Sequence, residues 1–126
     1  MDFPQELSYA RTHEWVRMTG ALSAQIGLTD YAQHKLGDLL LVDLPKVGDS
    51  VVSGERFGHI RSASASSDLF SPVTGRICAV NEALGNPPSA INTDPYGAWL
   101  IEVEGITDHE ILLSAEAYAA HAKKNG

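Results

Sequence analysis

Residues 57–75 are the segment that most restricts what this chain can fold into. They read Phe-Gly-His-Ile-Arg-Ser-Ala-Ser-Ala-Ser-Ser-Asp-Leu-Phe-Ser-Pro-Val-Thr-Gly. A short apolar run leads into small polar residues, and Leu69 to Pro72 lead out of them. Two extended arms around a run of small residues predict a β-hairpin with an exposed crest. Ser64 lies at the middle of that crest.

Similar turn signals flank the two arms of this hairpin. Pro45-x-x-Gly48 precedes the first arm, and Pro72-x-x-Gly75 opens the second. Because Pro-x-x-Gly is a common turn, this near-repeat alone is only weak support for two interleaved hairpins. We expect a mainly β fold with short helices and a C-terminal helix.

Period-2 alternation and capping residues predict the other elements. Strands are expected in an early hairpin that turns at Thr19-Gly20, and then at 39–42, 50–52, 75–81 and 99–104. A first helix is expected from Asp30 to Leu36, with Thr29 as its N-cap and Gly37 as its end. Capping chemistry at residues 107–110 predicts the start of a C-terminal helical region, with Ser114 as a second N-cap. The inward strand positions predict a core of Trp15, Ile26, Leu41, Val42, Ile77, Val80, Leu100, Ile101 and Val103.

Composition limits the classes of function. The chain has 126 residues and a net charge of −7, which fits one domain and lacks the basic clusters that bind nucleic acid. No apolar stretch is long enough to span a membrane, and the N-terminus lacks a signal-peptide pattern, so we expect a cytoplasmic monomer. The single cysteine, Cys78, excludes an internal disulfide and is expected to be a buried strand thiol.

Motifs for catalysis or metal binding are not found. The crest serines invite comparison with a hydrolase, but no Gly-x-Ser-x-Gly elbow surrounds them. The histidines are scattered without the spacing of metal ligands; they are His13, His34, His59, His109 and His121. We therefore expect neither a catalytic residue nor a metal site.

Several ordered blocks together resemble the glycine cleavage system H protein family. They include Thr12-His13-Glu14-Trp15-Val16, Gly27-Leu28-Thr29-Asp30-Tyr31-Ala32-Gln33, Asp94-Pro95-Tyr96-Gly97 and Ala115-Glu116-Ala117-Tyr118. In that family the crest reads roughly Glu-Ser-x-Lys-x-x-Ser-Asp-Leu-Tyr-Ser-Pro, with lipoate bound to the lysine as an amide. Ser62, Ser67 to Leu69, Ser71 and Pro72 match this pattern, whereas Ser64 falls on the lysine.

The resemblance implies a barrel-sandwich hybrid, the flattened β-barrel of lipoyl and biotinyl domains, and a carrier without an active site of its own. The family's lipoyl arm takes an aminomethyl group from the glycine decarboxylase (P protein) to the aminomethyltransferase (T protein), and dihydrolipoamide dehydrogenase (L protein) reoxidises it. The loaded arm folds into a cleft, which here would include Thr12, Glu14 and Asp68. Without the resemblance, the two carboxylates would be interpreted as solvated surface charges.

The departures from the family pattern lie at the crest itself. Ser64 replaces the lysine, Ala63 an apolar residue and Arg61 a glutamate. Since a hydroxyl cannot form the lipoyl amide, we expect no lipoate and a non-lipoylated, partner-binding or regulatory protein. The alternative is a working carrier, either with another cargo or attachment chemistry or as a lysine-substituted form of a genuine H protein. Phosphopantetheine on Ser64 is chemically conceivable but lacks its usual helical context.

Three acidic residues suggest a retained interface with the P or T protein. Glu14, Asp30 and Asp94 are expected in loop or edge segments, where packing does not obviously require a carboxylate. Turn chemistry could explain Asp30 and Asp94. An acidic surface would make such an interface weak and sensitive to salt.

Overall fold

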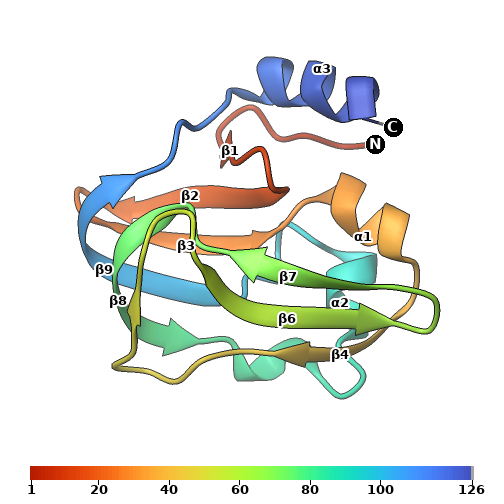
Figure 1. Ribbon diagram of the computed structural model, residues 1–126, viewed down its shortest axis with the longest axis horizontal. Helices are drawn as coiled ribbons and strands as arrows, with labels where there is room; N and C mark the ends of the chain where they lie inside the picture. Colours follow the sequence, from red (N-terminus) through yellow and green to blue (C-terminus); the bar gives the residue numbers. More distant parts are fainter. Residues whose placement is uncertain (126) are drawn as a thin grey trace.

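The structure, a computed structural model, describes residues 1–125 as two β-sheets with helices at their edges (Figure 1). The strands are β1 (Ser8–Tyr9), β2 (Glu14–Gly20), β3 (Ser23–Leu28), β4 (Leu39–Asp43), β5 (Ser50–Val51), β6 (Arg56–Ser62), β7 (Ser66–Phe70), β8 (Val73–Val80) and β9 (Ile101–His109). The helices are α1 (Asp30–Leu36), α2 (Ser89–Thr93) and α3 (Ala115–Asn125), with a 3-10 turn η1 (Glu82–Leu84).

The larger sheet has six strands in the order β1-β2-β3-β9-β8-β5, and the smaller has three in the order β4-β6-β7. Neighbouring strands in both sheets pair antiparallel. The mainly β fold with short helices and a C-terminal helix is therefore confirmed, with two sheets in place of one closed barrel. Within residues 1–125, no helix combines the length and the apolar character that crossing a bilayer requires.

The first helix has the bounds and caps that the sequence predicts. The Thr29 hydroxyl accepts a hydrogen bond from the Ala32 N–H at 3.2 Å, which satisfies one of the free donors of the first turn. Gly37 follows the helix with φ at 83°, a left-handed value that glycine adopts without strain. Local chemistry therefore sets the bounds of this element.

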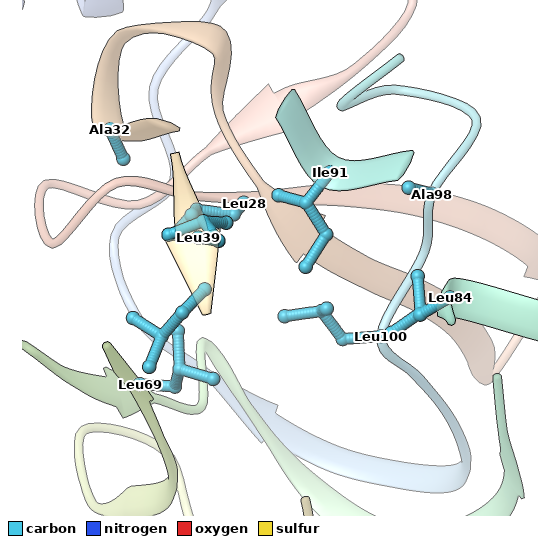
Figure 2. Close-up of a cluster of buried hydrophobic side chains, with 9 residues drawn as sticks. Leu28, Ala32, Leu39, Leu69, Leu84, Ile91, Ala98 and Leu100 are labelled. Carbon is cyan, nitrogen blue, oxygen red and sulfur yellow. The ribbon is translucent and has the colours of Figure 1, made fainter. Parts of the chain in front are cut away.

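Three hydrophobic clusters form the core. The first lies around residues from α1, α2, β4, β6 and β7, and Figure 2 shows Leu39, Leu84, Ile91 and Leu100 within it. A second cluster, around Tyr9, Trp15 and Tyr118, packs α3 onto the larger sheet, while a third lies along β3, β8 and β9. The core therefore depends on contacts between segments distant in sequence.

Most of the predicted core is confirmed, but the prediction that Leu41 is buried is wrong. The confirmed residues, all at most 1% exposed, are Trp15, Ile26, Ile77, Leu100, Ile101 and Val103. Leu41 is 42% exposed, and Val42 and Val80 are only half-buried. A register shift between Leu39 and Leu41 explains the error, because an irregularity in β4 breaks the alternation of faces.

The predicted helical start at residues 107–110 is also wrong. Strand β9 continues to His109, where it pairs with Val73, and Asp108 pairs with Thr74. Ladder hydrogen bonds to a distant strand here prevail over local capping preferences. The second predicted N-cap is confirmed, since the Ser114 hydroxyl accepts from the Ala117 N–H at 3.2 Å. Helix α2 and the turn η1 were not predicted.

Cys78 lies on β8, as expected, but it is half-buried and not buried. It lies at a register shift between Ile77 and Ala79 in the pairing with β9, and its Sγ lies 3.5 Å from the Glu102 carbonyl oxygen. Desolvation raises the pKa of the Cys78 thiol, and the nearby Glu102 and Glu104 carboxylates raise it further.

Replacing Leu100 with alanine should lower the free energy of unfolding by about 2–5 kcal/mol, because the side chain is fully buried and its removal leaves a cavity. Chemical denaturation measures this loss. Leu40→Ala is the matched control, since Leu40 is 48% exposed and should change stability by less than about 0.5 kcal/mol. Equal losses in the two variants would contradict the assignment of the core.

Candidate functional site

The predicted crest is the loop Ala63–Ala65 between β6 and β7, which projects at the right of Figure 1. Ser62 closes its base. The Ser62 N–H donates to the Ala65 carbonyl at 2.8 Å, and the Ala65 N–H donates to the Ser62 hydroxyl at 3.2 Å. Ser62 is buried, whereas Ala63, Ser64 and Ala65 are exposed. The hairpin therefore presents the Ser64 side chain to solvent on a closed, well-bonded turn.

A cavity of about 440 Å³ lies beside the crest. One wall is the segment 65–68 of the hairpin, and the opposite wall is α1, which contributes Tyr31 and Lys35 among others. Thr12, Glu14 and Asp68 all line this cavity, so the structure brings together the three positions singled out from the sequence. We call this space the crest cavity. Ser64 itself lies one residue before its wall.

Glu14 is the first residue of β2 and is completely buried, which corrects its assignment to a loop or edge position. The Thr12 hydroxyl donates to its Oε1, and the Phe70 N–H donates to its Oε2 at 3.1 Å. Burial raises the pKa of Glu14 to about 8, even though these hydrogen bonds favour the ionised form. Desolvation thus favours the neutral form of this carboxyl group on the lining of the crest cavity.

A tight turn places Thr12 next to Glu14. His13, between them, has φ at 81°, an uncommon value for a residue other than glycine. The turn is fixed by the Ala10 N–H, which donates to the Glu14 carbonyl at 2.9 Å, and by the Thr29 N–H, which donates to the His13 carbonyl at 3.1 Å. The left-handed backbone at His13 is thus built into the cavity wall.

Sequence reasoning did not identify the role of the His13 and Tyr118 side chains, although both fall in the blocks that carry the resemblance. His13 Nδ1 lies 2.7 Å from the Tyr118 hydroxyl, which lies 2.8 Å from the Thr29 hydroxyl. Burial lowers the pKa of His13 to about 4, helped by the nearby His121 and Lys35. Tyr118 therefore connects α3 to the N-cap of α1 and to the cavity turn.

Asp68 is exposed and already paired. Its Oδ1 lies 3.1 Å from Arg56 Nε and 3.3 Å from His59 Nδ1, the residue opposite it on β6. Exposed pairs of this kind contribute little to stability. They nevertheless hold the Asp68 carboxylate against the Arg56 and His59 side chains of the same hairpin.

The other two acidic residues have structural roles that the sequence argument underestimated. The Asp30 carboxylate accepts hydrogen bonds from the Asp2 N–H at 3.0 Å and from Gln33 Nε2 at 2.7 Å. Asp94 Oδ1 accepts from the Gly97 N–H at 3.2 Å, within a turn. Together with the burial of Glu14, these contacts mean that the three acids are not in themselves evidence for an interface.

The ionisation of Glu14 should appear in the pH dependence of stability. Between pH 4.5, its ordinary pKa, and about pH 8, the folded protein keeps a proton that the unfolded chain has lost, so this contribution to stability falls as pH rises. Glu14→Gln removes the contribution. The unfolding free energy of the wild type, relative to this variant, should therefore decrease from pH 5 to pH 8 in denaturation experiments.

Glu55→Gln is the control, because Glu55 lies exposed on the surface of the folded protein. The wild type and this control should keep a constant difference over the same pH range. A constant difference for Glu14→Gln as well would mean that Glu14 is ionised throughout.

Comparisons with known proteins agree with this geometry. Residues 7–125 match the protein family described as glycine cleavage H-protein. The glycine cleavage system H protein of Rubrobacter xylanophilus is 50% identical over 119 residues, which cover 94% of this chain and 93% of that protein. That of Myxococcus xanthus is 46% identical over 122 residues, which cover 94% of each.

The crystal structure of a glycine cleavage system H protein from Mycobacterium marinum superimposes with a TM-score of 0.88 at 40% identity, covering 95% of this chain and 98% of that one. The chain belongs to the glycine cleavage H-protein family, whose members are non-catalytic lipoyl carriers.

Proposed function

We propose that this chain is an H-like protein that carries no lipoate and acts by binding the partners of glycine cleavage, as a regulator or scaffold. The observation that carries the proposal is Ser64, exposed at the crest of the β6–β7 hairpin. By resemblance this is the position of the lipoyl lysine. We also propose that residues 1–126 form a single H-protein-like domain and that the protein is cytoplasmic.

The chemistry by which lipoate is attached supports a protein that carries none. Lipoate is held as an amide, which requires a primary amine, and a serine hydroxyl offers none. The four lysines lie elsewhere: Lys35 is in α1, Lys46 is in the loop before β5, and Lys123 and Lys124 end α3. The hairpin from Arg56 to Phe70 thus contains no amine that a ligase could modify, and the group does not fit this crest.

The charges of the hairpin are a second support for a protein that is not loaded. Asp68, one of the carboxylates that a cationic adduct would meet, is paired with Arg56 and His59 of the same hairpin. Arg61, at a position where the family carries glutamate, adds another positive charge near the crest. Binding to partner proteins requires neither a lipoyl arm nor ionised carboxylates in the crest cavity.

Partners of glycine cleavage follow from family membership. H proteins of this family work with the P, T and L proteins. We propose the T or P protein as the partner retained here. The acidic net charge of −7 would contribute to that contact at low salt.

Lipoate ligase should leave the mass of the wild-type protein unchanged, because the crest offers no amine. Ser64→Lys should gain one lipoyl group, and Arg61→Glu combined with Ser64→Lys should raise the yield by restoring the family's charge. Intact-mass spectrometry measures both outcomes.

Ser66→Lys is the matched control, since it places a lysine on β7, two residues past the crest position, and should be modified poorly. A lipoyl group on the wild-type protein would disprove the proposal. A folded Ser64→Lys protein that stays unmodified would show that residue 64 is not the carrier position.

Binding to the T or P protein should be detectable in pull-down experiments at about 20 mM salt and should weaken several-fold at about 200 mM, as screening predicts. Adding the wild-type chain to a reconstituted glycine cleavage system with a lipoylated H protein should lower its rate. Binding to neither protein by a normally folded chain would exclude the regulator. Support of glycine cleavage in the absence of any other H protein would favour the working carrier.

A further inference from the structure

A second cavity, of about 540 Å³, lies between the N-terminal segment, α1 and α3. It is separate from the crest cavity, although Tyr31 and Lys35 line both. We call it the terminal cavity. Its size falls within the range of sites that hold small molecules, roughly 300–1,000 Å³. Figure 1 shows the N-terminal segment running beneath α3 toward the end of the chain.

Hydrogen bonds fix the N-terminal wall of this cavity. The Tyr96 hydroxyl donates to the Asp2 carbonyl at 2.6 Å, and the Tyr9 hydroxyl donates to the Pro4 carbonyl at 2.6 Å. The Asp2 N–H donates to the Asp30 carboxylate. Phe3, between these anchors, packs edge-on against Tyr118 with ring centroids 5.2 Å apart. The wall is therefore a bonded part of the fold.

The inner surface of the terminal cavity is apolar. Phe3 and Tyr31 contribute aromatic faces, and Ala119 and Ala122 contribute small side chains that leave space above α3. Tyr31 and Ala122 are themselves buried, so they give the cavity a firm floor. An apolar chain lying here would be removed from water, which is favourable in proportion to its buried area.

The rim of the cavity is cationic. Lys35 and Lys123 supply the charge, His34 lies beside them, and none of the lining residues that the structure describes is acidic. Lys35 Nζ lies 5.8 Å from the centroid of the Tyr31 ring, so this lysine extends over the aromatic floor. Among the residues that the structure describes, neither lysine forms an ion pair. Two of the four lysines of an acidic chain thus meet at one opening.

We propose that the terminal cavity binds a small amphipathic carboxylate with an unbranched apolar chain. The chain lies along Phe3, Tyr31 and the alanines of α3, and the carboxylate lies between Lys35 and Lys123. Lysine suits this role because its ammonium group pairs with a carboxylate as a mobile point charge, while its stem packs on apolar surface. The assignment does not depend on the chemistry of the crest.

A test uses the full-length, isotope-labelled protein and sodium decanoate as the probe, below its micelle concentration. Amide chemical shifts should change saturably at Phe3, Tyr31, Lys35, Ala119 and Ala122. Replacing both rim lysines with methionine keeps their apolar stems and should weaken binding at least fivefold. Ala119→Leu places a larger side chain in the cavity and should weaken decanoate binding by a similar factor.

Two controls separate this site from general affinity for fatty chains. Lys46→Met removes a lysine remote from the cavity and should bind decanoate as the wild type does. Decylamine, with the same chain and the opposite charge, should bind at least fivefold more weakly. The proposal is overturned if decylamine binds equally well, if the double methionine variant is unaffected, or if the shift changes occur at the exposed Leu40 and Leu41.

Discussion

The buried carboxyl group of Glu14 is the polar contact on which the site depends. It begins β2 in the larger sheet and accepts the N–H of Phe70 at the end of β7 in the smaller one, so one side chain joins the two sheets. Burying a carboxyl group is unfavourable unless it is hydrogen-bonded, and Thr12 and Phe70 supply those bonds. The left-handed turn at His13 and the Tyr118 hydroxyl then fix the segment that carries Thr12.

Local signals in the sequence predicted the elements that depend on local chemistry. Thr29 and Gly37 define α1, and Ser114 caps α3, because a cap is formed by residues a few positions apart. The errors occur where distant segments decide. Leu41 became exposed through an irregularity in the pairing with β6, and residues 107–109 became strand by pairing with β8. Neither partner strand can be read from the local sequence.

The candidate site likewise combines features that could be predicted with others that depend on distant segments. Thr12, Glu14 and Asp68 were found only through resemblance, and the structure shows that they share a cavity. The burial of Glu14 could not be predicted, because an acidic residue beside a histidine and a tryptophan has no local mark of its environment. The pairing of Asp68 with Arg56 and His59 could not be predicted either, because it depends on the register of β6 with β7. The terminal cavity needs three segments that are distant in sequence, namely the N-terminal segment, α1 and α3.

The closed base of the crest has a consequence for how this chain can change over time. Ser62 and Ala65 hold the turn through backbone atoms and one serine hydroxyl, and the side chain at position 64 packs against no buried cluster. Selection for folding is therefore indifferent to the residue at that position, and only selection for chemistry can preserve a lysine there. A lineage that ceases to need the arm can lose it without losing the protein. A lineage that needs it again can recover the amine by one substitution on an intact scaffold.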